Sequence, residues 1–251
     1  MSIKREISNK KIFDFDSKEI ISYAERTATD ITDMSWNDSV KTVLSVCCDS
    51  PTLFPEIKSW SSNEDYITKW LKKYFGGYNN RPSKRTSKKI GTVSDDIIDT
   101  IISDRLPTLS TGAINHIKYA HRLCMSAENI LGLLLEEYIA EKLSSYGWHC
   151  AWGATINKID FCTKKGELLQ VKNRSNSENS SSSSVRKGTI IRKWHRVNAQ
   201  NGAYYWKELN QLIGCSHLSE EDFATFVRQT IAENPAALYV EDSKYWQQVQ
   251  S

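Results

Sequence analysis

The chain has 251 residues, of which 39% are hydrophobic and 25% are charged, and its formal net charge is +3. This length and composition are typical of a folded globular protein and exclude disorder along the whole chain. The densest apolar stretch, residues 130–135, is far shorter than the roughly 20 residues of a membrane-spanning helix. No hydrophobic core of a signal peptide follows the first five residues. We therefore expect a soluble intracellular protein.

The cysteines do not form a recognisable metal or disulfide pattern. They contain no Cys-x-x-Cys pair, and in an intracellular chain they are interpreted as buried thiols rather than as a disulfide framework or a zinc site. The six residues are Cys47, Cys48, Cys124, Cys150, Cys162 and Cys215.

The positive charge is concentrated in one stretch, residues 172–196, which contains seven basic residues and a single acidic residue, Glu178. The rest of the chain is therefore mildly acidic. A local basic stretch of this kind is typical of a surface that contacts phosphates, although a solvated charged face is the alternative.

Residues 1–94 are predicted to form a helical accessory region that contacts DNA or supports the part that does. Helical patterns cover Lys18–Thr29 and Glu64–Tyr74. A second basic cluster follows them and is interpreted either as a flexible linker or as a DNA-contacting arm. Its members are Arg81, Lys84, Arg85, Lys88 and Lys89.

The strongest helical pattern lies between residues 127 and 143, with Ser126 as the predicted N-cap. Two β-strands are expected after it, at residues 155–162 and 168–173. The residues between them, Lys164-Lys165-Gly166, suit a three-residue hairpin loop with the glycine in the left-handed conformation.

This hairpin predicts a register. Pairing of Thr163 with Glu167 places Asp160 opposite Gln170, and Lys172 then lies on the same face as Gln170 because side chains alternate along a strand. Three polar side chains are thus expected to converge on one face of the sheet. An ordinary ion pair between Asp160 and Lys172 is the alternative interpretation.

The remainder of the chain has weaker patterns. Residues 175–184 form a serine-rich polar loop that cannot build a core. Residues 189–191 are a candidate short strand, and residues 219–232 a helix with Ser219 as its cap and an apolar side.

Hydrolysis of a phosphodiester requires a hard divalent cation, which carboxylate, amide and carbonyl oxygens bind. Asp160, Gln170 and Glu136 are the candidate ligands. Lys172 is a candidate for orienting the attacking water or stabilising negative charge. Glu136 is preferred to Glu137 because it shares a helical face with the apolar Ile139 and Leu143, whereas Glu137 is expected to be more exposed.

This arrangement resembles the PD-(D/E)XK nuclease superfamily, in the variant with glutamine at the second acidic position. The resemblance covers residues 126–175, and Ile159 replaces the proline that commonly precedes the aspartate of the family. It implies an α/β (α+β) fold with a restriction-endonuclease-like core, in which helices flank a central mixed β-sheet. It also implies that Glu136, Asp160, Gln170 and Lys172 are the catalytic residues and that Mg²⁺ is the cofactor.

Residues 171–186, 191–196 and 206–209 make the chain most similar to the SinI-like type II restriction endonucleases. Membership implies cleavage of double-stranded DNA at a short palindrome of the GG(A/T)CC type. A palindrome presents two scissile phosphates related by a two-fold axis, which implies a homodimer. A prokaryotic cytoplasm and a cognate DNA methyltransferase that protects the host DNA are implied as well. Residues 95–251 would then form the catalytic and recognition domain.

The segment that follows the catalytic strand is the predicted DNA-reading segment, since arginine can read guanine and asparagine can read adenine in the major groove. Its candidate contacts are Asn173, Arg174, Asn176, Arg186, Lys187, Arg192, Lys193 and Arg196. Two other functions stay open from the sequence, namely a repair or junction nuclease of the same fold and a nucleic-acid-binding protein without catalysis.

Overall fold

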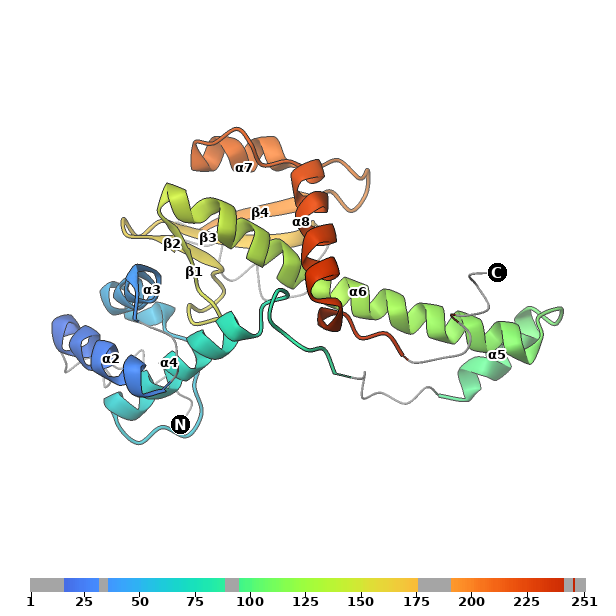
Figure 1. Cartoon of the computed structure of the whole chain (residues 1–251), viewed down its shortest axis with the longest axis horizontal. Coiled ribbons are helices and arrows are strands. Elements are labelled where there is room, and N and C mark those ends of the chain that lie inside the picture. The colour runs from blue at the N-terminus through green and yellow to red at the C-terminus, as the bar shows by residue number, and fades with distance from the viewer. Residues whose placement is uncertain (1–15, 32–35, 89–94, 176–190, 242–245, 247–251) are drawn as a thin grey trace.

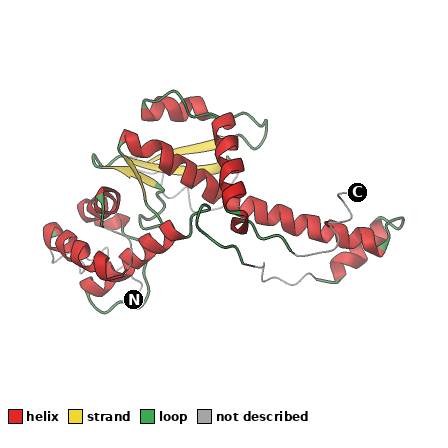
Figure 2. Ribbon diagram, viewed as in Figure 1, coloured by secondary structure: helices red, strands yellow, loops and turns green. Residues whose placement is uncertain are grey.

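The computed structural model describes residues 16–31, 36–88, 95–175, 191–241 and 246. Within these ranges the protein has seven α-helices and one four-stranded sheet (Figure 1, Figure 2). The helices are α2 (Ser17–Ile31), α3 (Asp38–Asp49), α4 (Asn63–Asn79), α5 (Ile97–Arg105), α6 (Thr111–Leu143), α7 (Trp206–Ile213) and α8 (Glu220–Glu233). The strands are β1 (Trp148–Cys150), β2 (Phe161–Thr163), β3 (Leu168–Arg174) and β4 (Ile191–Val197). Short 3₁₀ helices are η1 (Pro51–Leu53), η2 (Ser144–Tyr146) and η4 (Pro235–Ala237).

The sheet has the strand order β1-β2-β3-β4 and is mixed. The pairs β1–β2 and β2–β3 are antiparallel, whereas β3 and β4 run parallel. Helices cover the sheet on both sides, so the predicted α+β fold with a central mixed sheet and a helical N-terminal region is confirmed.

Alternating side chains of the sheet build two hydrophobic cores. Phe161 and Leu169, which pair across β2 and β3, pack with α6, α7 and α8. Their neighbours Cys162 and Leu168 point to the opposite face and pack with α2, α3 and α4. Because successive residues of a strand face opposite sides, the hairpin joins the N-terminal helices and the C-terminal helices to one sheet.

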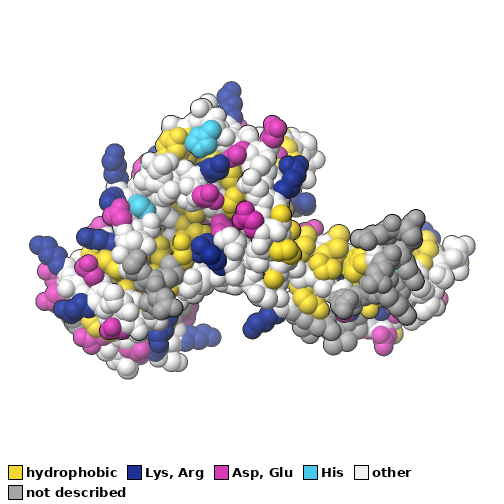
Figure 3. All heavy atoms as spheres, viewed as in Figure 1, with side chains coloured by type: hydrophobic (Ala, Val, Ile, Leu, Met, Phe, Trp, Pro, Cys, Tyr) yellow, Lys and Arg dark blue, Asp and Glu magenta, His cyan; other side chains and the backbone are white. Residues whose placement is uncertain are grey.

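An arm projects from this body. It consists of α5 and the first half of α6, residues 97–129, and is defined here as the α5–α6 arm (Figure 1). Hydrophobic side chains are visible on its surface (Figure 3). Among the described residues of the arm only Ile114 is buried.

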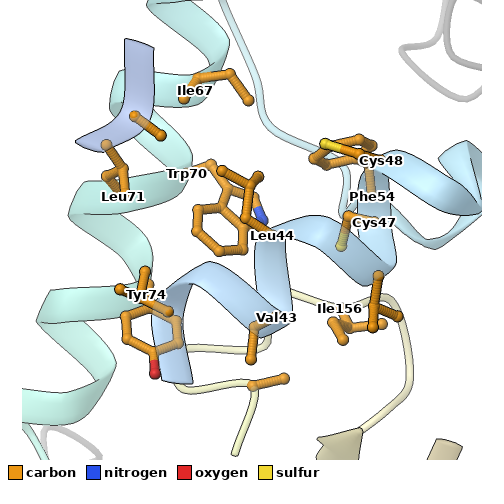
Figure 4. Packing of buried hydrophobic residues seen from close by; sticks show 14 of the residues in the cluster. Val43, Leu44, Cys47, Cys48, Phe54, Ile67, Trp70, Leu71, Tyr74 and Ile156 are labelled. Carbon is orange, nitrogen blue, oxygen red and sulfur yellow. The ribbon is translucent and has the colours of Figure 1, made fainter. Parts of the chain in front are cut away.

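The N-terminal helices pack closely on the loop that leads to β2 (Figure 4). Trp70 of α4 is fully buried, and its indole N–H donates to the carbonyl of Thr155 at 2.9 Å. The Asn157 N–H donates to the Leu53 carbonyl at 2.7 Å. These bonds fix the chain just before Asp160. Both predicted N-terminal helices are present, and the structure adds α3, a helix of mostly buried residues that was not predicted.

The prediction that Ser126 caps the long helix is wrong. The helix begins at Thr111, with Ser110 as N-cap, and ends at Leu143 as expected. Apart from Ile114, the first half of the helix has no buried residues. The periodic hydrophobic pattern therefore predicted only the second half, which packs on the sheet. The C-terminal helix is confirmed, since the Ser219 hydroxyl accepts from the Asp222 N–H at 3.1 Å.

The strand predicted at residues 155–162 is mostly wrong, because β2 begins only at Phe161. Lys158 has a φ of 63° and forms a tight turn. An isolated antiparallel bridge joins Ile156 and Ile159 across this turn, and both side chains are buried. The strand predicted at 168–173 is confirmed, and β4 extends from Ile191 to Val197 rather than ending at 191. Residues 189 and 190 lie outside the described residues.

The segment 81–87 is bound to the body, so its interpretation as a flexible linker is wrong. The Asn234 side-chain amide donates to the carbonyls of Pro82 and Arg85 at 2.8 and 2.9 Å. The Ser87 N–H donates to the Ala236 carbonyl at 2.8 Å. Lys89 and the domain boundary proposed at residue 94 lie in a range outside the described residues.

The expectation of buried thiols holds for four of the six cysteines. Cys124 is exposed on the arm and Cys215 is half-buried. In the part of the chain that the structure describes, no helix combines the length and the apolar character needed to cross a membrane.

We expect Gly77→Ala to destabilise the fold and Gly76→Ala not to. A Cβ at Gly77 would lie 2.1 Å from the backbone nitrogen of Gly153, whereas a Cβ at Gly76 meets no atom within 4 Å. For Gly77→Ala we predict that the free energy of unfolding falls by at least about 1–3 kcal/mol. For Gly76→Ala the predicted change is a gain of up to about 1 kcal/mol. Urea denaturation measures both, and equal effects would contradict this packing.

Candidate active site

The β2–β3 hairpin forms the register that the sequence predicts. Gly166 closes it with a φ of 79°, and the Thr163 N–H donates to the Glu167 carbonyl at 3.0 Å. Phe161 pairs with Leu169 and Cys162 with Leu168, as this register requires. Asp160 precedes β2 and donates its N–H to the Leu169 carbonyl, so its pairing with Gln170 stays a prediction.

Asp160 is held at the start of β2 by the neighbouring strand. Its Oδ2 accepts from the Val171 N–H at 2.7 Å, and its own N–H donates to the Leu169 carbonyl at 3.1 Å. The carboxylate is therefore fixed beside β3 through backbone groups, which do not depend on any side-chain rotamer. Gln170, the residue before Val171, is buried on the opposite face from Leu169.

Glu136 of α6 reaches this group from the helix. Burial raises the pKa of Glu136 to about 7, the Asp160 charge adds to the increase, and Lys172 opposes it. Burial also raises the pKa of Asp160 to about 6, against the Val171 hydrogen bond and the Lys172 charge. The structure thus brings two carboxylates and one ammonium group within electrostatic range of each other.

The adjacent Glu137 has a different environment, and the expectation that it is exposed is wrong. It is only 7% exposed. Its carboxylate pairs with Arg81 at 3.1 Å and accepts from the N–H of Ser83 at 3.0 Å and from the Ser83 hydroxyl. Consecutive residues of a helix point about 100° apart, so Glu136 faces the hairpin while Glu137 binds the segment after α4.

Parallel pairing of β4 with β3 adds two residues that the sequence did not place in the site. Lys193 pairs with Gln170, and His195 pairs with Lys172. Residues in register on adjacent strands share a face, so these side chains lie next to the two polar residues of β3. The alternation of Lys193 and His195 with the buried Trp194 could have indicated a strand. The parallel partner is decided only in three dimensions.

Aromatic packing fixes β4 and α6 relative to each other. Trp194 donates to the Tyr205 carbonyl at 2.7 Å, and its ring packs on Trp206 with centroids 5.0 Å apart. Trp206 in turn meets Tyr138 of α6 edge-on. Tyr138 lies two residues after Glu136, so this cluster fixes the helix over the sheet.

The predicted DNA contacts have different environments. Asn176, Arg186 and Lys187 lie outside the described residues. Arg174 and Arg192 are exposed, and Arg192 is 3.5 Å from Glu167.

Arg196 is not available to DNA. It is only 8% exposed, and its guanidinium donates to Asn173 at 2.8 Å and pairs with Glu220. Its role in this structure is to join β3, β4 and α8.

The donor set fits a hard divalent cation. Glu136 and Asp160 supply carboxylate oxygens, a ligand type that Mg²⁺ prefers, whereas Gln170 is buried on the face of β3 that points away from α6. Two neighbouring carboxyls with raised pKa values also form a site whose repulsion a cation would relieve. No cluster of three or more His, Cys, Asp or Glu side chains suited to a metal occurs among the described residues. The candidate site accordingly relies on two carboxylates.

Comparison with known proteins decides the family. A family model described as SinI restriction endonuclease matches residues 20–233, which include all four candidate residues. The chain belongs to the SinI restriction endonuclease family.

Two curated relatives are similar to this SinI-family chain. The type II restriction enzyme Eco47I of Escherichia coli is 39% identical over 147 residues, which cover 57% of this chain and 64% of that enzyme. The type II restriction enzyme SinI of Salmonella infantis is 40% identical over 141 residues, covering 54% of this chain and 61% of that enzyme. The chain thus spans less than two thirds of the length of either relative.

We expect the metal-free SinI-family chain to lose stability as the pH rises from about 4 to about 7. The ordinary pKa values are 4.5 for Glu136 and 3.8 for Asp160, and both are higher in the folded chain. The folded state therefore binds more protons in this window, so deprotonation disfavours it. The double variant Glu136→Gln, Asp160→Asn should melt at a higher temperature than the wild type at pH 8 in chelator.

The matched control is Asp222→Asn. The hydrogen bond from Lys142 lowers the pKa of Asp222, so its charged form stabilises the fold, and this variant should melt at a lower temperature at pH 8. Adding Mg²⁺ or Ca²⁺ should raise the melting temperature of the wild type and not that of the double variant. A wild-type melting temperature that rises steadily with pH would contradict the electrostatics described here.

Proposed function

We propose that this chain is a type II restriction endonuclease that hydrolyses phosphodiester bonds of double-stranded DNA at a short palindrome in a Mg²⁺-dependent reaction. One observation carries the proposal, namely the pair of half-buried carboxylates, Glu136 and Asp160, beside Lys172 in a SinI-family chain. A purely structural ion pair would need one carboxylate for one lysine. A second, partly desolvated carboxylate beside the same lysine is costly without a cation.

Asp160, Glu136 and Gln170 are the proposed holders of Mg²⁺, which when bound offsets phosphate charge and supplies an activated water. The hydrogen bond from the Val171 N–H fixes the orientation of the Asp160 carboxylate, which is the first of these proposed ligands. Glu136 approaches from α6, so the site is complete only when the helix is seated on the sheet. Partial burial of both carboxylates raises their pKa values and strengthens their interaction with a cation.

Lys172 is the proposed water-orienting residue. It lies two positions after Gln170 on the same face of β3, and its charge acts on both carboxylates. A protonated ammonium beside them can donate hydrogen bonds to the attacking water or to the phosphate oxygen on which charge develops. Lys193 and His195, in register with Gln170 and Lys172, extend this polar face toward the flanking phosphates.

Contact with DNA is proposed for the exposed Arg174 and Arg192 and for Lys193, together with Asn176, Arg186 and Lys187 on the evidence of sequence alone. Arginines immediately after a catalytic strand can reach phosphates and guanine edges. The GG(A/T)CC site, a homodimer and a cognate methyltransferase are proposed from the family resemblance.

The direct test is incubation of the purified chain with long unmethylated DNA and Mg²⁺, followed by mapping of the fragment ends. We expect discrete fragments whose ends share one short palindrome, activity with Mn²⁺ as well, and none in excess chelator. Ca²⁺ should allow binding with little cutting, because its looser coordination positions water poorly. Cutting in chelator would refute the metal-dependent mechanism. Cutting restricted to branched DNA would indicate a repair or junction nuclease, and binding without cutting a non-catalytic protein.

Lys172→Ala and Asp160→Ala should each abolish cleavage while specific DNA binding stays within about tenfold of the wild type. Both side chains act on the metal and the water rather than on base contacts. Cleavage assays and electrophoretic binding assays measure the two quantities separately. Retained turnover in both variants would show that the site lies elsewhere.

Glu136→Ala is expected to lose most cleavage activity without loss of stability. Glu137→Ala is the matched control on the next residue. It leaves the Arg81 charge and the Ser83 N–H without their partner, so we expect a loss of unfolding free energy of about 2–4 kcal/mol with mild effects on the turnover of the folded fraction. The reverse ranking of the two turnover numbers would assign the metal to Glu137.

A further inference from the structure

The α5–α6 arm exposes most of the large hydrophobic side chains on the described surface. Nine such side chains are exposed among the described residues, and six of them belong to the arm or its connecting turn. These six are Ile97, Ile98, Ile101, Leu106, Ile117 and Met125. Figure 3 shows hydrophobic surface along the arm, away from the sheet. A concentration of exposed large hydrophobic side chains on one part of the surface is typical of an interaction surface.

The arm is also short of internal stabilisation. No residue of α5 is buried, and Ile97 and Ile101, four residues apart on one helical face, are each 62% exposed. An isolated pair of helices in water is marginally stable, because helices in proteins derive most of their stability from packing of an apolar face. The apolar face of α5 is therefore open to a further packing partner.

The charge of the arm favours a protein partner over DNA. Residues 97–129 contain three acidic and three basic residues. Two of the three basic side chains are engaged within the chain, Lys118 with Asp99 and Arg122 with Glu241, each at 2.8 Å. A neutral surface neither attracts a polyanion nor repels an identical surface.

We propose that the α5–α6 arm is the surface through which two copies of this chain associate, with the two arms packed as an antiparallel four-helix bundle. A two-fold interface uses the same patch on both copies, and two helical hairpins that bury their apolar faces on each other form such a bundle. Burial of six partly exposed side chains in each copy removes on the order of 500 Å² of apolar surface, a large share of the roughly 800 Å² per partner in a stable interface.

This inference deepens the proposed function, since cleavage of both strands of a palindrome needs two sites in one particle. The arm leaves the body at the start of the sheet-packed half of α6, the helix that carries Glu136. One rigid helix would thus connect the association surface to the proposed catalytic carboxylate in each copy.

The test is the mass of the full-length chain in solution without DNA, measured by light scattering after size exclusion. We expect about 57 kDa, twice the 28.7 kDa of one chain. The double variant Ile97→Asp, Ile101→Asp should shift to the monomer mass with an unchanged circular dichroism spectrum. Tyr146→Asp, at an exposed aromatic residue outside the arm, should stay dimeric.

Hydrogen exchange of the wild type provides a measurement that needs no variant. Upon dilution, peptides from residues 97–105 and 111–125 should lose protection, whereas peptides from 220–233 should not. A monomeric wild type, or a double variant that stays dimeric, would overturn the proposal. Neither readout uses DNA cleavage, so a dimer formed by the arm that fails to cut DNA would refute the proposed function and leave this inference standing.

Discussion

The positions of the polar groups in the candidate site depend on the register of the β2–β3 hairpin. Gly166 closes the hairpin in the left-handed conformation, and the Val171 N–H holds the Asp160 carboxylate. A slip of one residue would turn every side chain of β3 to the other face. Gln170 and Lys172 would then point into the core beneath α6, and Leu169 would leave it. Apolar packing therefore enforces the geometry that the chemistry needs.

The hairpin also creates an electrostatic imbalance. Two half-buried carboxylates, Glu136 and Asp160, lie near a single lysine, and their pKa values are raised. Elsewhere the chain balances its buried charges, as with Glu137 and Arg81 or Glu220 and Arg196. An excess of negative charge in a partly buried cluster of titratable groups is a feature of functional sites. A bound cation would supply the positive charge that balances the two carboxylates.

Packing around the candidate site holds its charged side chains in position. The N-terminal helices are packed on the loop before Asp160 through the Trp70 hydrogen bond, and the segment after α4 is held by Glu137 and Asn234. On the other face, Trp194 packs at a tilt on Trp206, which meets Tyr138 of α6 edge-on, and these contacts set α6 against β4. The helical accessory region thus shares a core with the sheet and supports the candidate site.

The sequence by itself determined the β2–β3 hairpin, because the glycine turn at Gly166 fixes the pairing of Thr163 with Glu167 and with it the register of the two strands. Family resemblance added the fold. Tertiary structure alone decided where β4 pairs, and so placed His195 beside Lys172 and buried Arg196. Parallel pairing joins segments distant along the chain, and no local pattern encodes it. Likewise, the burial of Glu137 depends on an ion pair across 56 positions with Arg81, which helical periodicity cannot reveal.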